Sequence, residues 1–243
     1  MLRTSLKALA IVGGLFAAAP SAHAAGEAVH IPNAGFSFDG IFGSFDRASA
    51  QRGFQVYQQV CAACHSAHLL SYRNLRELGL TEQQVVAIAS QVQIQDGPND
   101  EGQMFERPGR PSDRFRSPFP NPQAARAGIT GALPPDLSVI AKARAGGANY
   151  LYALLTGYED APPGVTLADG MNYNRYFPGH QIAMARPLNP DQVEFADHTP
   201  ATVENMARDV STFLAWAAEP ELEERRAMGV KIIIFLTLLA GLA

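Results

Sequence analysis

Two cysteines and the histidine after the second one are the residues whose types and spacing point to chemistry. They stand as Cys61-Ala62-Ala63-Cys64-His65, and the chain has no other cysteine. The C-x-x-C-H pattern is typical of c-type haem attachment, in which two thiols bond to one porphyrin and the histidine binds its iron. A disulfide, a zinc site and a thioredoxin-like pair are rival interpretations, but zinc wants four ligands and no βαβ context surrounds the motif. We therefore expect one covalently bound haem c, held by Cys61 and Cys64, with His65 as its first axial ligand.

The second axial ligand decides what such an iron can do. A methionine sulfur raises the reduction potential and fills the coordination sphere, so that the iron passes electrons instead of binding substrate. Met184 is the best candidate, because the prolines of Tyr176-Phe177-Pro178-Gly179 and Arg186-Pro187 predict a stiff, extended loop around it. His180 and His68 remain alternatives. Three other methionines are less suited, one on an apolar helix stripe and two in unsupported loops: Met206, Met104 and Met171.

An arginine is a further candidate for cofactor binding. Arg144 lies among small residues in Ala143-Arg144-Ala145-Gly146-Gly147. A planar guanidinium is a natural bidentate partner for a haem propionate. An ordinary surface arginine is the alternative interpretation, and the local pattern leaves it open.

Helices must position these side chains. The apolar spacing of Ala50, Phe54 and Tyr57 predicts a helix over 46–61 that enters the attachment motif. The clearest helix follows Thr199, the expected N-cap, and carries an apolar stripe until Pro220. Shorter helices are expected over 68–80, 81–92 (with Thr81 as N-cap), 135–145 and 149–156, the last ended by Gly157. We expect long ordered loops over 96–135 and 159–190, which are rich in proline and glycine.

Both ends of the chain carry membrane or targeting signals. Residues 1–24 have a basic start, an apolar stretch and the small-x-small site Ala22-His23-Ala24, which predicts a cleaved signal peptide and export to a periplasm. Residues 225–243 place an apolar run after Arg225, Arg226 and Lys231, and they read as the start of a transmembrane anchor that is too short to cross a bilayer. The haem domain is expected to occupy 25–224. The formal charge of −4 argues against nucleic-acid binding.

Four blocks of the mature chain resemble the cytochrome c1 family, the haem subunits of cytochrome bc1 complexes. They are residues 52–65 (RGFQVYQQVCAACH), 131–138 (GALPPDLS), 173–179 (YNRYFPG) and 213–220 (FLAWAAEP). The resemblance implies a mainly α, class I c-type cytochrome fold with long loop insertions and a C-terminal transmembrane helix. It also implies that Met184 is the sixth ligand and that Arg144 contacts a propionate.

The resemblance further implies a one-electron carrier that is not a catalyst on its own. Its partners would be cytochrome b, a Rieske iron-sulfur protein as electron donor, a soluble cytochrome c as acceptor, and the membrane. The expected location is a bacterial inner membrane, single-pass, with the haem domain on the periplasmic side. Acidic residues would steer a basic acceptor, and the candidates are Glu159, Asp160, Glu101 and Asp100.

Two other functions remain to be weighed. A membrane-bound c-type cytochrome that donates to a terminal oxidase would share the chemistry but have different partners. A haem peroxidase would need an open sixth position and a nearby acid-base residue, for which His180 is the candidate.

Overall fold

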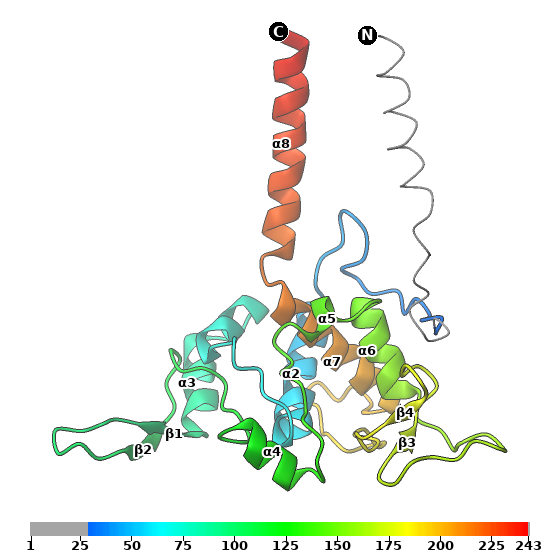
Figure 1. Cartoon of the computed structure of the whole chain (residues 1–243). Coiled ribbons are helices and arrows are strands. Elements are labelled where there is room, and N and C mark those ends of the chain that lie inside the picture. Colours follow the sequence, from blue (N-terminus) through cyan, green and yellow to red (C-terminus); the bar gives the residue numbers. More distant parts are fainter. Residues whose placement is uncertain (1–28, 243) are drawn as a thin grey trace, which may run out of the picture.

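The computed structural model describes residues 29–242, and the predicted signal peptide lies outside them. The domain is mainly helical, as predicted (Figure 1). Two helices cross at its centre, α2 (Arg47–Gln59) and α7 (Val203–Ala218), while α5 (Ile140–Ala143) and α6 (Gly147–Thr156) pack beside α7. The attachment motif follows α2 directly, so this helix pair positions it.

The α2–α7 crossing is close because a glycine stands at the contact. An ideal Cβ on Gly53 would lie 1.9 Å from the carbonyl oxygen of Asp209, so no larger residue fits there. Asp209 is buried, and its carboxylate accepts hydrogen bonds from Ser49 Oγ (2.6 Å) and Arg52 Nε (2.7 Å). This pairing supplies the partners that a buried carboxylate needs, and it holds the crossing together.

The apolar stripe of the last predicted helix is buried as expected, but its start was predicted three residues too early. Thr202, not Thr199, is the N-cap of α7, and its hydroxyl accepts from the backbone N–H of Asn205 at 3.1 Å. The side chain of Asn205 donates to the carbonyl of Pro200, and the carbonyl of Ala201 accepts from the backbone of residue 191. The carbonyls of Pro200 and Ala201 are therefore used in hydrogen bonds that are not part of the helix, and the helix begins only after Thr202.

The shorter helices were predicted with mixed success. Helix α3 (Glu82–Ser90) begins with a capping box on Thr81, and α6 ends at Gly157, both as expected. The segment 68–80 forms only a 3₁₀ helix, η2 (Tyr72–Leu78), and 135–145 yields only the single turn of α5. The latter is short because residues 135–138 bind the chain after the attachment motif, as described below.

The segment 96–135 is not one continuous loop, which corrects the prediction. Strands β1 (Gln93–Asp96) and β2 (Phe105–Pro108) pair as an antiparallel hairpin, and α4 (Pro122–Gly128) follows with Asn121 as its N-cap. Arg107 binds the carboxylates of Asp96 and Asp113, which fixes the hairpin to the segment after it. The segment 159–190 is irregular as expected, apart from the two-residue strands β3 (Asn172–Tyr173) and β4 (Gln181–Ile182).

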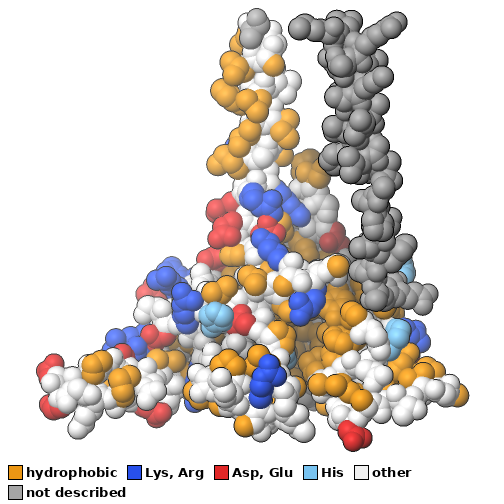
Figure 2. Space-filling model, in the orientation of Figure 1, with side chains coloured by type: hydrophobic (Ala, Val, Ile, Leu, Met, Phe, Trp, Pro, Cys, Tyr) orange, Lys and Arg blue, Asp and Glu red, His pale blue; other side chains and the backbone are white. Residues whose placement is uncertain are grey.

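The C-terminal apolar run forms part of a long exposed helix, α8 (Leu222–Leu242). Figure 2 shows this helix projecting from the domain, with hydrophobic side chains above a band of charged ones. Among residues 29–242, no helix is long and apolar enough to cross a membrane. The expected transmembrane helix is therefore not found in this part of the chain, because the first ten residues of α8 include Glu223, Glu224, Arg225, Arg226 and Lys231.

Candidate haem site

The attachment motif forms a tight turn at the end of α2. Residues Cys61–Ala63 make one 3₁₀ turn, and the carbonyl of Cys61 accepts from the backbone N–H groups of Cys64 (3.1 Å) and His65 (2.9 Å). Both thiols are free, and burial raises the pKa of Cys61 to about 12. Two unpaired thiols on one turn, followed directly by an imidazole, fit a covalently bound haem c. Within residues 29–242 no cluster of His, Cys, Asp or Glu has the composition of a zinc site.

The imidazole of His65 is held in one tautomer. Its Nδ1 lies 2.8 Å from the carbonyl oxygen of Pro135, which can only accept, so Nδ1 carries the hydrogen. The lone pair of Nε2 is then left for a metal, which is the arrangement that histidine ligands commonly have. Burial lowers the pKa of His65, although the Pro135 bond opposes this, and the neutral form is favoured.

A carboxylate fastens the segment 135–138 to the chain after the motif. Asp136 Oδ2 accepts from Ser66 Oγ (2.7 Å), from the backbone N–H of His68 (2.9 Å) and from His68 Nδ1 (2.6 Å). Asp136 Oδ1 accepts from the backbone N–H of Ser138 at 2.9 Å. Burial opposes ionisation of Asp136, but these hydrogen bonds outweigh it and hold its pKa well below the usual range. Asp136 thereby fixes the carbonyl that orients His65.

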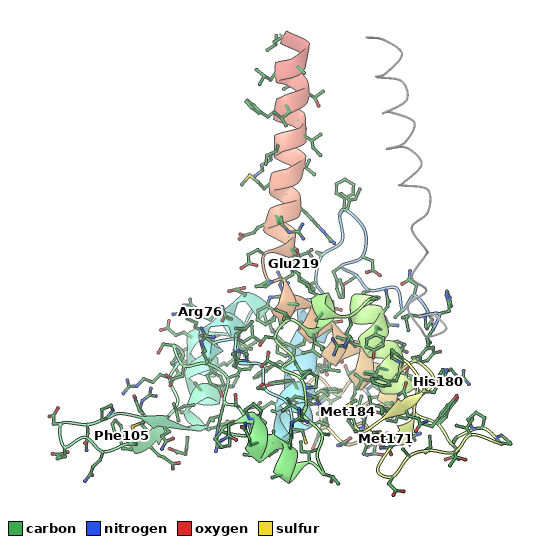
Figure 3. All side chains as sticks on the ribbon, viewed as in Figure 1. Arg76, Phe105, Met171, His180, Met184 and Glu219 are labelled. Atoms are coloured by element: carbon green, nitrogen blue, oxygen red, sulfur yellow. The ribbon has the colours of Figure 1, made fainter. Side chains whose placement is uncertain are left out.

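Met184 lies half-buried in the loop after β4, and its backbone is held by a tyrosine (Figure 3). The hydroxyl of Tyr158 donates to the carbonyl of Met184 at 3.0 Å, and Arg186 donates to the carbonyl of Tyr158 at 2.6 Å. Burial raises the pKa of Tyr158, so its hydroxyl keeps its proton and acts as a donor. The prolines around Met184 are therefore not its only support.

Arg144 is exposed, immediately after α5. Its Nη1 donates to the carbonyl of Ala143 at 3.1 Å, and within residues 29–242 no carboxylate pairs with it. Burial raises the pKa of Tyr150 in α6, and the nearby charge of Arg144 works against that rise. Tyr150 in turn contributes to the raised pKa of Tyr158. Arg144 is thus close enough to Tyr150 for its charge to act on that phenol, and its guanidinium is exposed.

The alternative ligands are engaged elsewhere. His68 is exposed and bound to Asp136, as described above, while His180 stacks on Tyr173 with ring centroids 5.6 Å apart. His180 Nδ1 also lies 3.3 Å from the carbonyl of Asn174, which places this ring in the β3–β4 hairpin. Among the other methionines, Met206 is fully buried in α7, while Met104 and Met171 are 55% and 39% exposed.

Three residues that shape the site were not identified as site residues from the sequence. Pro135 and Asp136 stand in a quoted family block, but their partners lie about 70 positions earlier in the chain. Tyr158 follows the glycine that ends α6, and no local pattern marks its bond to a residue 26 positions later. The proposed docking acids are also not gathered on one element. Asp100 and Glu101 lie in the β1–β2 turn, whereas Glu159 and Asp160 follow α6 at the other end of the view in Figure 1.

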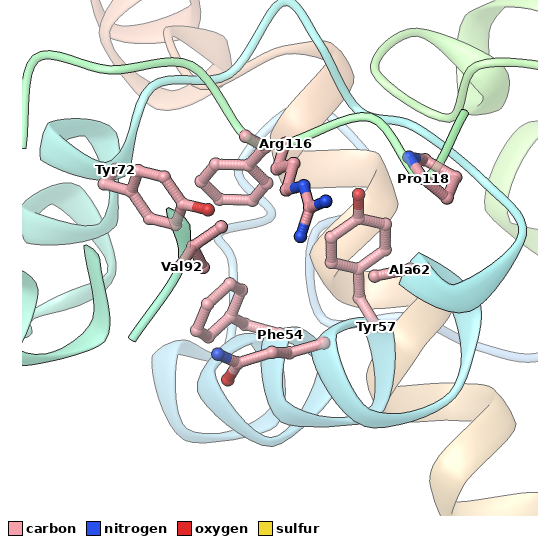
Figure 4. A pocket seen from close by; sticks show the side chains of 9 residues that line it. Phe54, Tyr57, Ala62, Tyr72, Val92, Arg116 and Pro118 are labelled. Carbon is pink, nitrogen blue, oxygen red and sulfur yellow. The ribbon is translucent and has the colours of Figure 1, made fainter. Parts of the chain in front are cut away.

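A cavity of about 260 Å³ lies beside the attachment turn (Figure 4). Its wall includes the aromatic rings of Phe54, Tyr57 and Tyr72, together with Arg116 and Ala62. Ala62 belongs to the motif, but neither cysteine, His65 nor Met184 lines this space. The cavity therefore adjoins the attachment turn through Ala62 and is not lined by the four candidate site residues.

Comparisons with known proteins find relatives whose names describe them as haem proteins or as subunits of a cytochrome b-c1 complex. The profile of the Cytochrome C1 family matches residues 36–243. The chain is 51% identical over 241 residues to "Cytochrome c1 1, heme protein, mitochondrial" of Arabidopsis thaliana, covering 97% of this chain and 78% of that protein. It is 50% identical over 215 residues to "Cytochrome b-c1 complex catalytic subunit, mitochondrial" of Candida albicans, covering 88% and 75%. It is also 48% identical over 233 residues to "Cytochrome b/c1" of Bradyrhizobium diazoefficiens, covering 87% of this chain and 34% of that protein.

Proposed function

The chain belongs to the cytochrome c1 family, and on that premise we propose that it takes electrons from a Rieske iron-sulfur protein and gives them to a soluble cytochrome c. It does so as the cytochrome c1 subunit of a cytochrome bc1 complex, beside cytochrome b, and it carries haem c. The observation that carries the site assignment is the pair of free thiols on one turn with an imidazole whose Nδ1–H is already bound by Pro135.

Each residue of the site has a separate task. Cys61 and Cys64 would hold the haem covalently, His65 and Met184 would bind its iron, and Arg144 would bind one of its carboxylates. When bound, the haem supplies an iron that alternates between the ferric and ferrous states. The carbonyl of Pro135 keeps the imidazole turned and neutral, and the Tyr158 hydroxyl keeps the backbone of Met184 in place. With both His65 and Met184 bound to it, the iron would have no open position for substrate, which favours electron transfer over peroxidase chemistry.

The membrane location is part of the proposal. The apolar end of α8, from Ile232 to Leu242, enters the lipid and contributes to a single-pass anchor, while the haem domain stays on the periplasmic side of a bacterial inner membrane. Its support is the exposure of this helix, with Ile233 at 67% and Phe235 at 62%. Exposed large apolar surface of this extent is uncommon on a soluble domain. The export-type residues 1–24 also favour the periplasm.

Replacement of the proposed sulfur ligand tests the assignment. In Met184→Leu, haem should stay attached through Cys61 and Cys64, the reduction potential should fall, and the ferrous protein should bind carbon monoxide. Met171→Leu is the matched control, because Met171 is 39% exposed and belongs to a different part of the same irregular segment (Figure 3). The measurements are haem staining of the denatured protein on a gel, the reduction potential of the haem, and the absorption spectrum of the ferrous protein under carbon monoxide. If Met184→Leu kept the wild-type potential and excluded carbon monoxide, the sulfur assignment would be wrong.

A further inference from the structure

The most exposed apolar side chains of the domain itself lie at the tip of a short loop beside α8. This loop, residues 39–44, carries Ile41 at 72% exposure and Phe42 at 87%. In Figure 1 it rises next to the lower turns of α8, on the side of the domain from which that helix projects. Neither the redox site nor the hydrophobic core uses these two side chains.

The loop is a built structure and not a loose connection. The backbone N–H of Ser44 donates to the carbonyl of Ser37 (3.1 Å), and that of Asp39 donates to the carbonyl of Phe36 (3.0 Å). At the base, the ring of Phe38 stacks on that of Phe36 and packs at a tilt against that of Phe45, with ring centroids 5.0 and 4.9 Å apart. A Cβ on Gly43 would lie 2.2 Å from the carbonyl of Asp39, so the chain turns too tightly there for another residue. The base is therefore ordered, while the apolar tip is left exposed.

The base of the loop is also bonded directly to α8. Arg226 Nη1 donates to the carbonyls of Phe38 (2.8 Å) and Gly43 (2.7 Å). The backbone N–H of Phe45 donates to Glu223 Oε1 at 2.8 Å, and the other oxygen of Glu223 pairs with Arg47 at 3.0 Å. The loop consequently keeps a fixed height along the helix.

The distance from this attachment to the apolar part of α8 is short. From Arg226 to Ile232 the helix advances six residues, which is a rise of about 9 Å. From Phe38, whose carbonyl contacts Arg226, to Ile41 the chain has three residues and can span up to about 10 Å. Three fully extended residues would therefore span about the same distance as the helix covers between Arg226 and the start of the apolar run.

We propose that Ile41 and Phe42 insert into the headgroup region of the bilayer and form a second membrane contact beside α8. The partner is a lipid surface, because the tip is apolar and lies on the side of the domain from which the apolar helix projects. Before its apolar run, α8 also carries Arg225 and Lys231, whose charges attract lipid phosphates. This inference rests on the membrane location proposed above. Two attachment points would fix the orientation of the haem domain relative to the membrane, which one helix alone would leave free to rotate.

Lipid quenching of fluorescence tests the contact. The full haem-loaded chain is reconstituted in vesicles that contain anionic phospholipid and lipids brominated along the acyl chain. Phe42→Trp reports on the loop, and Phe105→Trp is the control, because Phe105 is 43% exposed on the β1–β2 hairpin, far from α8 in Figure 3. The native Trp216 is 1% exposed, and its emission is subtracted with the wild-type chain. We expect bromolipid to quench the indole at position 42 and not the one at position 105.

A third probe separates failure of this inference from failure of the membrane proposal. Phe235→Trp places an indole on the apolar part of α8. Quenching at 235 without quenching at 42 would overturn the loop contact alone, and the absence of both would overturn the membrane location itself. If the indole at 42 shifted to the blue in the assembled complex without lipid quenching, the tip would meet protein, which also overturns the inference.

Vesicle binding supplies an independent measurement. Phe42→Asp should weaken partitioning of the full chain about tenfold, since one large apolar side chain is lost from the interface. Phe105→Asp should leave partitioning unchanged. Equal partitioning of the two variants would contradict the proposed contact.

Discussion

The carboxylate of Asp136 offers the sharpest test of how the histidine side of the site is built. It accepts four hydrogen bonds, three at Oδ2 and one at Oδ1, from Ser66, His68 and Ser138. Asp136→Asn keeps the size of the side chain but has only one oxygen. If that oxygen stays on the Oδ2 side, the amide nitrogen faces the N–H of Ser138, and two donors oppose each other. The remaining three bonds lose their charge.

The expected cost follows from these losses. A buried backbone N–H without an acceptor costs about 1–3 kcal/mol. A hydrogen bond to a charged acceptor is stronger than one to a neutral acceptor by about 1 kcal/mol, and these gains add only in part when several bonds share one carboxylate. Because the side chain of Asp136 is 23% exposed, water recovers part of this. We expect a net destabilisation of about 3 kcal/mol, which lowers the unfolding temperature of a domain of this size by about 6–12 °C.

Thermal unfolding of the holoprotein, followed by far-ultraviolet circular dichroism, measures this change. Asp160→Asn is the matched control, because Asp160 is an exposed carboxylate with no side-chain hydrogen bond to the described residues, and it should change the unfolding free energy by less than about 0.5 kcal/mol. An unfolding temperature for Asp136→Asn equal to that of the control would refute the view that this carboxylate fastens the two segments together.

Two further perturbations probe the methionine side and the helix crossing. Tyr158→Phe removes the donor to the carbonyl of Met184, a loss of about 1–2 kcal/mol, and should leave the haem content unchanged. The proposed bond between sulfur and iron should then break at a lower temperature, which the thioether-to-iron absorption band reports. Loss of this band at the wild-type temperature would contradict the proposed support. Gly53→Ala would press a methyl group against the backbone of Asp209, and urea unfolding should show a loss of about 3 kcal/mol or more. Gly229→Ala, with open space around it, should not destabilise the chain.

The features of the site and of the fold that were predicted correctly depend on residues that lie close together in the sequence. Cys61, Cys64 and His65 stand within five positions, and the structure places them on one turn. The buried stripe of α7 and the cap at Thr81 follow from helical spacing and from a side chain that binds a backbone group three residues away. Such features need no knowledge of the rest of the chain.

The parts that could not be predicted depend on partners far away in the sequence. The segment 135–138 was predicted as the start of a helix, but its groups bind residues 65–69, so only α5 is helical. Similarly, the β1–β2 hairpin was missed because proline and glycine dominate the composition of its surroundings, whereas Arg107 and its two carboxylates stabilise it. Long-range hydrogen bonds overrode local propensity in both places.

The identity of the proposed ligands could likewise be predicted from nearby residues, whereas the groups that hold those ligands in place could not. Ligand identity is a matter of residue type, and a short motif with a stiff loop is enough to suggest it. Ligand orientation depends on Pro135 for the imidazole and on Tyr158 for the methionine backbone, and neither group would bind the iron itself. Because these two supports share no residue and no hydrogen bond, each side of the site can be loosened without the other.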